Sequence, residues 1–316
     1  AMEYPEEMQR NGITYPWVKE RLIKHFDDWK IVARIFDHMT LVPDTAKYNK
    51  LVDHIGNDSV VASSASDPSS PMHHIQKYFF EGTDFFLFYK ERNAELTRFA
   101  SSIASYYEQV LDILARSSVE LVTWGGNYDA TITYPPYFEK EIFPWLKKAA
   151  HKLQAGGIPV ITHCDGENDG LMELIKNTGV DGAESVCPFP MTRLKLHEYY
   201  GRWSDRLTII GGIPAEYLIK NMASDETFEG YLDYLMKSVA PGLRYIGGIT
   251  DAVPVDADFD RLRRIHDFFE RKGRTPLVQG SIPPFFKESE SRKSAPKPES
   301  MDVGEKYRTV QETIFK

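Results

Sequence analysis

The stretch Ile158-Pro159-Val160-Ile161-Thr162-His163-Cys164-Asp165-Gly166-Glu167-Asn168 decides how the fold of this chain is interpreted. Its apolar first half predicts a buried strand, and a helical pattern follows after a short turn. Successive side chains of a strand point to opposite faces, so we expect His163 and Asp165 on one face and Cys164 on the other. An imidazole beside a carboxylate at the carboxyl end of a buried strand indicates a functional site.

The same alternation of strand, turn and helix extends along most of the chain. Apolar runs predict six strands, at 60–64, 119–124, 158–162, 181–186, 207–211 and 243–248. Helical patterns lie between and after them, at 72–80, 83–116, 135–154, 168–177, 193–201, 214–239 and 257–272. Strands separated by helices pair in parallel, which predicts an α/β fold, either a barrel or a doubly wound sheet. An eight-stranded barrel needs two strands more than this pattern supplies.

The chain divides into three parts. Residues 1–50 show helical patterns and no clear strand, so this N-terminal helical segment either hides a strand or leaves a barrel incomplete. Residues 51–279 carry the βα alternation. Residues 280–316 begin with a polar linker, and their last part predicts a short amphipathic helix that docks on the barrel or on a neighbouring subunit. A frayed tail is the alternative for that last part.

Composition excludes several classes of partner. The 46 acidic residues outnumber the 38 basic ones, which gives a formal net charge of −8 and argues against a nucleic-acid partner. No apolar run approaches the roughly 18 residues of a membrane span, and the opening residues lack the pattern of a secretory leader. With 2 cysteines the chain has no disulfide framework. We therefore expect a cytoplasmic enzyme with no membrane partner.

Short motifs follow one another over about residues 45–272. They are Gly125-Gly126-Asn127-Tyr128-Asp129, Tyr134-Pro135-Pro136-Tyr137-Phe138, Pro144-Trp145, Gly157-Ile158-Pro159-Val160, His163-Cys164-Asp165-Gly166, Gly179-Val180-Asp181-Gly182, Gly211-Gly212-Ile213-Pro214 and Gly248-Ile249-Thr250-Asp251-Ala252-Val253-Pro254. In this order they resemble the uroporphyrinogen decarboxylase superfamily. The resemblance implies a (β/α)8 TIM-type barrel over residues 51–279. The superfamily contains the haem-pathway decarboxylase and methyltransferases that pass methyl groups to or from a corrinoid.

Chemistry in such barrels takes place at the carboxyl ends of the strands. We expect catalytic roles for three residues there: Asp129, His163 and Asp165. Substrate contacts are expected from Asn127, Trp124 and Tyr128, and a metal ion would have as candidate ligands His163, Asp165, Glu184 and Asp251. Structural alternatives remain for most of these residues, as strand caps, turn formers or loop stabilisers. Glu184 differs, because a carboxylate in an apolar run needs a partner.

Other reactive residues of the chain have simpler interpretations. Cys164 and Cys187 are expected to be small buried residues, with a ligand role for Cys187 as the minority alternative. His73 and His74 begin a helix, and we expect them on a solvated face.

Two reactions compete for this site. The decarboxylases carry an N-terminal motif with arginines and an aspartate, which the chain lacks, and its acidic mouth would repel a substrate with eight carboxylates. The methyltransferases bind zinc through a His-x-Cys pair and a distant Cys, but here Asp165 replaces the first thiol and Thr250-Asp251 the second. This predicts a harder site for zinc or another divalent metal.

The sequence thus predicts a methyltransferase that takes a methyl group from a small substrate, such as an aryl methyl ether. The acceptor is a corrinoid that a partner protein carries, since no stretch reads as a corrinoid-binding domain. A decarboxylase or lyase for a smaller carboxylated substrate is the second hypothesis, and a non-catalytic ligand-binding barrel is the third. A homodimer is left open.

Overall fold

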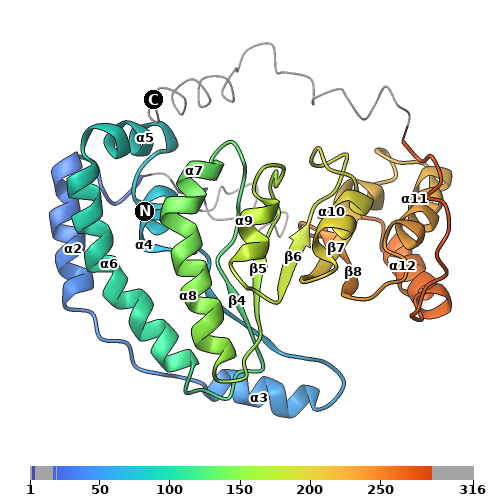
Figure 1. Cartoon of the computed structure of the whole chain (residues 1–316), viewed down its shortest axis with the longest axis horizontal. Helices are drawn as coiled ribbons and strands as arrows, with labels where there is room; N and C mark the ends of the chain where they lie inside the picture. The colour runs from blue at the N-terminus through green and yellow to red at the C-terminus, as the bar shows by residue number, and fades with distance from the viewer. Residues whose placement is uncertain (1, 4–16, 19, 287–316) are drawn as a thin grey trace.

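A six-stranded parallel sheet organises the molecule (Figure 1). The computed structural model describes residues 2–3, 17–18 and 20–286. The strands are β3 (Ala62–Ser66), β4 (Leu121–Trp124), β5 (Val160–His163), β6 (Gly182–Val186), β7 (Thr208–Pro214) and β8 (Tyr245–Thr250). They lie side by side in the order in which they occur in the chain. All six strands expected from the sequence are therefore confirmed.

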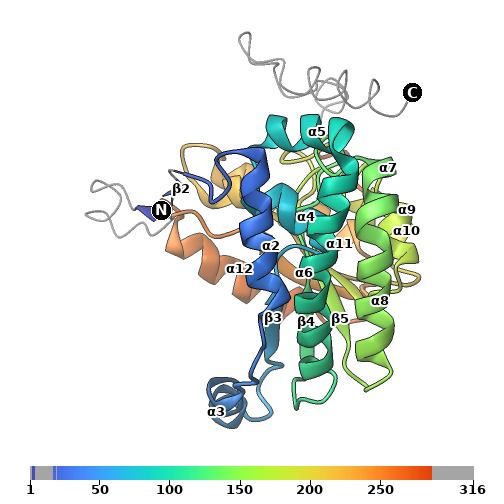
Figure 2. The same cartoon turned by 90° about the vertical axis from the view of Figure 1, so that its left-hand side faces the viewer.

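The closed eight-stranded barrel is not confirmed. Within the described ranges, the sheet runs from β3 to β8 and these two outer strands are not paired with each other. The arrangement of a curved parallel sheet with neighbouring helices is nevertheless consistent with a TIM-like α/β fold (Figures 1 and 2). The shortfall of two strands that the sequence showed is thus present in the described structure.

Helices connect the strands and lie next to them, with α8 against β5 and α10 against β7. In chain order they are α4 (Pro71–His74), the π-helix η2 (Ile75–Phe79), α5 (Gly82–Glu91), α6 (Asn93–Leu114), α7 (Pro135–Tyr137), the π-helix η3 (Phe138–Ile142), α8 (Phe143–Gln154), α9 (Met172–Asn177), α10 (Leu196–Trp203), the 3-10 helix η4 (Ala215–Leu218), α11 (Asp225–Ser238) and α12 (Phe259–Lys272). The helix expected over 83–116 is interrupted at Arg92, whose backbone (φ −129°, ψ 33°) is not helical.

The strand β7 extends three residues beyond its predicted end, into the segment expected to be helical. Gly211 and Gly212 pair with Gly247 and Gly248 across β7 and β8. A Cβ on Gly211 would lie 2.4 Å from a methyl carbon of Thr250, so the close approach of the two strands requires glycine there. Because paired glycines carry no side chains, the hydrophobic pattern gave no sign of this extension.

The described part of the N-terminal segment contains helices and a pair of short strands. The 3-10 helix η1 (Phe26–Asp28) leads into α2 (Trp29–Asp37), which buries Trp29 and Phe36 and packs on α6 (Figure 2). The helix α3 (Ala46–Ile55) follows. Two short strands, β1 (Met2–Glu3) and β2 (Trp17–Val18), pair antiparallel outside the main sheet and were not predicted.

The C-terminal part is described as far as Phe286, in an extended segment that follows α12. The predicted amphipathic helix near the C-terminus lies outside the described residues. Among the helices that are described, each is too short or too polar to serve as a membrane span.

Candidate functional site

His163 is the last residue of β5 and lies at the carboxyl edge of the sheet. Its neighbour across the ladder is Glu184 on β6, in register with it. Nδ1 of His163 lies 2.5 Å from Oε2 of Glu184, so a proton on Nδ1 is donated to that carboxylate. The partner that Glu184 was expected to need is therefore His163.

The other ring nitrogen of His163 faces two carboxylates. Its Nε2 lies 3.6 Å from Oδ2 of Asp165 and 3.5 Å from Oδ1 of Asp251, the residue that follows β8. One ligand atom from each of these three side chains lies within 4.8 Å of the other two. Strand alternation thus brings His163 and Asp165 to one face, as predicted, and chain topology adds Asp251.

The donor set of this cluster fits a divalent metal ion. One imidazole nitrogen and carboxylate oxygens are ligands for zinc and for harder divalent ions. Oδ1 of Asp165 is buried and has no hydrogen-bond partner among the described residues, which is costly for a carboxylate unless a cation covers it. Glu184 lies on the opposite side of the imidazole, where a carboxylate orients a metal-binding histidine rather than ligating the ion.

The electrostatics of the cluster favour charged side chains. Burial lowers the pKa of His163, but the carboxylates of Asp165 and Glu184 outweigh that effect and raise it to about 10. For Asp165, burial raises the pKa, and the contacts with His163 and Asn127 outweigh it, so the pKa lies below its usual value. A metal ion at Nε2 would therefore displace a proton from His163.

Asn127 belongs to the same group of side chains. Its Nδ2 donates to Oδ2 of Asp165 at 2.7 Å, and its Oδ1 accepts from the ammonium group of Lys77. The backbone of Asn127 has φ 58°, a left-handed conformation that asparagine tolerates well. The predicted substrate residue thus lies against Asp165 and fixes one of its oxygens.

Lys77 and Asp67 were missed in the sequence. Lys77 on η2 forms an ion pair with Asp67 (2.7 Å) in addition to its contact with Asn127. Asp67 comes directly after β3, at the same edge of the sheet as His163, and that position was the signal that could have identified it. Lys77 is on a helix, where no strand-end rule applies.

Three other predicted residues lie away from the cluster. Asp129 accepts hydrogen bonds from the backbone N–H of Thr131 (2.8 Å) and of Glu167 (3.3 Å), so its carboxylate organises the loop after β4. Trp124 and Tyr128 have no exposed surface. The indole N–H of Trp124 donates to a backbone carbonyl (3.2 Å), and the hydroxyl of Tyr128 bonds to Thr162 (2.7 Å). These aromatic residues are therefore part of the buried core.

The cysteines and histidines elsewhere give one confirmation and one correction. Cys164 and Cys187 are both buried and free, as expected. The expectation of a solvated face for His73 is wrong, because its side chain is only 3% exposed. Its Nδ1 accepts from the backbone N–H of Ser69 at 3.2 Å, and burial is the main cause that lowers its pKa to about 3. Pro71, Met72 and His73 are all buried, so this helix start faces the interior of the protein instead of the solvent.

Comparison with known proteins bears on the fold. No protein-family model and no curated protein matches the chain. Among solved structures, the chain is similar to a methyltransferase from Methanosarcina mazei, with a TM-score of 0.53 and 10% sequence identity over 78% of this chain. The similarity concerns the α/β fold of the two chains. It spans 65% of the length of that methyltransferase.

Proposed function

We propose that this protein is a metal-dependent methyltransferase of the uroporphyrinogen decarboxylase superfamily. In this proposal His163, Asp165 and Asp251 hold a divalent ion, and a small methylated substrate gives its methyl group to a corrinoid on a partner protein. The observation that carries the proposal is the environment of the two ring nitrogens of His163. Nδ1 contacts Glu184 at 2.5 Å, while Nε2 faces the carboxylates of Asp165 and Asp251. The sequence motifs and the methyltransferase-like fold support the reaction class.

The residues of the chain would act through orientation and charge. Glu184 keeps the proton of His163 on Nδ1, so that Nε2 remains a lone-pair donor when an ion is present. Asn127 fixes Asp165 by its amide, and Lys77 fixes Asn127 in turn. A bound divalent ion supplies Lewis acidity toward the atom from which the methyl group departs.

The donor set favours oxygen as that atom. Transfer of a methyl group from an ether breaks a carbon–oxygen bond and leaves the electron pair on oxygen, which must be stabilised as it gains charge. Nitrogen and carboxylate ligands leave the ion hard, and hard ions prefer oxygen to thiolate sulfur. An aryl methyl ether is therefore the preferred class of methyl donor.

Decarboxylation of a carboxylated substrate is less well supported by the contacts. Such a substrate needs cationic side chains at the site. Among the described contacts of the cluster the cations are Lys77, which pairs with Asp67, and protonated His163, which pairs with Glu184. The acidic cluster itself would repel a carboxylate in the absence of a metal ion.

Metal content is the first test of the proposal. We expect the purified protein to retain about one equivalent of a divalent ion after gel filtration, and His163→Ala to lose it. His151→Ala, which changes an exposed histidine on α8, is the matched control and should retain the ion. A native protein that binds neither zinc, cobalt nor manganese would leave the metal site without support.

The reaction itself is tested by absorbance. The native protein, a corrinoid protein and a panel of aryl methyl ethers should produce the spectrum of methylcobalamin, and His163→Ala should not. Formation of coproporphyrinogen from uroporphyrinogen, with no methyl transfer from any donor, would contradict the proposal and favour the decarboxylase.

A further inference from the structure

A cavity opens on the same edge of the sheet as the His163 cluster. It has a volume of about 680 Å³, within the range of small-molecule sites. Phe189, three residues after β6, and Glu216, two residues after β7, lie on its wall. Because both strands end at the carboxyl edge, the cavity lies beyond the strand ends, where barrels of this type bind ligands.

Aromatic rings form much of the wall of this cavity. Phe286 lies edge-on to Phe189 with ring centroids 4.8 Å apart, and Phe285 lies edge-on to Phe286 at 4.9 Å. Tyr217 completes the group, 6.3 Å from Phe285. Gly230 on α11 admits Phe285, since a Cβ there would lie 3.2 Å from its ring. The extended C-terminal segment is thus packed into place and supplies two of the rings.

The charge of the cavity is negative. Glu216 and Glu226 line it, and no lysine, arginine or histidine is among its lining residues. The ammonium group of Lys195 lies over the ring of Phe286, 5.8 Å from its centroid, so two carboxylates stand against one cation there. Glu216 is partly buried, and within the described part of the chain its carboxylate has neither a hydrogen bond nor an ion pair. Burial raises the pKa of this carboxyl, which is the expected effect when a carboxylate loses water and gains no partner.

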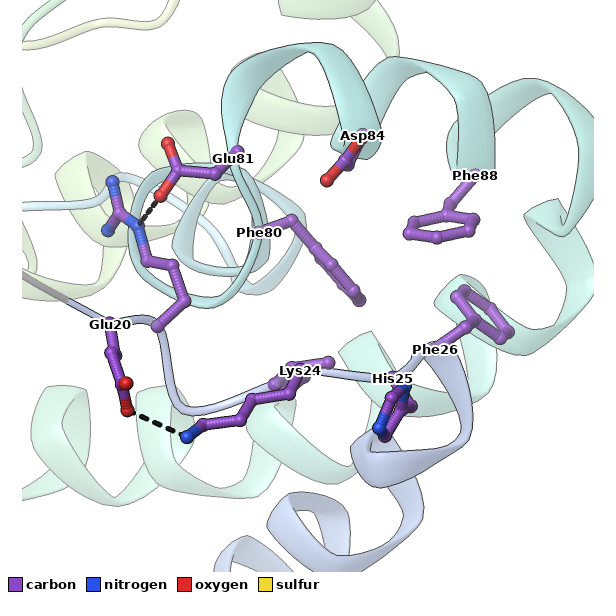
Figure 3. A pocket seen from close by; sticks show the side chains of 10 residues that line it. Glu20, Lys24, His25, Phe26, Phe80, Glu81, Asp84 and Phe88 are labelled. Carbon is purple, nitrogen blue, oxygen red and sulfur yellow. Dashed lines mark hydrogen bonds and ion pairs between the residues drawn. The ribbon is translucent and has the colours of Figure 1, made fainter.

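A smaller cavity near the N-terminal segment differs from this one in the charges of its wall (Figure 3). Its volume is about 340 Å³, and it also combines phenylalanine rings with charged side chains. There Lys24 pairs with Glu20 at 2.7 Å and Arg21 with Glu81 at 3.1 Å, and Asp84 is a further carboxylate in the wall. That cavity therefore has cationic side chains in its own wall, whereas no lysine, arginine or histidine lines the larger one.

We propose that the cavity bounded by Phe189, Glu216 and Phe286 binds an organic ammonium ion. Aromatic faces attract alkylated ammonium groups, which are too weakly hydrated to prefer water strongly, and a carboxylate supplies the opposite charge. Metal ions do not fit this wall, because phenylalanine rings offer no ligand atoms, and one partly buried carboxylate with one exposed carboxylate is too few. The site is distinct from the metal cluster, and its occupancy does not depend on methyl transfer.

Binding of a cation and of its neutral isostere tests this proposal. The full chain is titrated calorimetrically, without added metal, with choline and with 3,3-dimethylbutan-1-ol, which has the same shape and no charge. We expect choline to bind saturably and at least roughly tenfold more tightly than the alcohol. No saturable binding of choline, or equal affinity for both probes, would overturn the proposal.

Variants locate the binding. Glu216→Gln keeps the shape of the side chain and should weaken choline binding about tenfold or more, and Phe286→Leu should weaken it several-fold. Glu173→Gln, which removes an exposed carboxylate on α9, is the control and should bind choline as the native chain does. Thermal melting verifies that each variant is folded. A folded Glu216→Gln variant with native affinity would rule out the assigned site.

Discussion

The burial of His73 makes a quantitative prediction about acid stability. The imidazole is held neutral in the folded protein, with a pKa of about 3, whereas the unfolded chain exposes it to water with its ordinary pKa of about 6.5. The unfolded state therefore binds the extra proton, and the stability that the neutral histidine provides is complete above pH 6.5. That stability is lost as the pH falls below 6.5 toward 3.

The magnitude follows from proton linkage. Well below pH 6.5 each pH unit costs about 1.4 kcal/mol, so His73 alone should remove about 2.7 kcal/mol of the free energy of unfolding between pH 7.5 and pH 4.5. A shift of one unit in the folded pKa changes this figure little, because pH 4.5 lies well above 3. The loss is a large fraction of the stability of a typical domain.

Urea unfolding followed by circular dichroism from pH 7.5 to 4.5 measures this loss. Carboxylates also titrate in this range, so the informative quantity is the difference between variants. His73→Gln should reduce the fall in the free energy of unfolding by about 2–3 kcal/mol. His54→Gln, on the exposed surface of α3, should leave the fall unchanged. If His73→Gln loses stability as steeply as the native chain, the neutral buried histidine is refuted.

Three further predictions concern the site and its support. Glu184→Gln should lower the affinity for a divalent ion about 10–100-fold, because His163 would no longer be held in its orientation. Competition with a chelating dye measures this affinity, and an unchanged value would exclude the orienting role. Lys77→Met should weaken the affinity for the ion by a smaller factor and leave the melting temperature near native, because Lys77 acts on Asp165 only through the side-chain amide of Asn127. A change in the melting temperature alone would indicate that the lysine is purely structural. Gly166→Ala should cost about 1–3 kcal/mol in urea unfolding, since the added Cβ would lie 2.3 Å from a backbone carbonyl oxygen in the loop after β4; native stability would show that this loop can move.

The strands were predictable because a strand that is buried on both faces needs a short run of apolar residues. Positions such as Val122, Val160 and Ala183 are fully buried in the sheet, and they supplied the pattern. The pattern fails where side chains are missing, as at Gly211-Gly212, or where a helix is interrupted without proline or glycine, as at Arg92.

The cluster was predictable to the extent that alternation and strand ends determine it. Alternation gave the pairing of His163 with Asp165, and the rule for buried carboxylates gave Glu184 a partner. The sequence could not show that Glu184 orients His163 while Asp251 lies on the metal-facing side. That difference depends on which ring nitrogen of His163 each carboxylate reaches. Lys77 was hidden for a similar reason, since its contact with Asn127 is made across 50 residues of chain.

The order of strands in the sheet, which equals their order in the chain, bears on how the protein is made. A ribosome delivers β5 and β6 before β8, so the imidazole of His163 can be anchored while the chain is still incomplete. Asp251 arrives with the last strand. A nascent chain would therefore hold only part of the donor set, and capture of a metal ion would mark the end of sheet assembly.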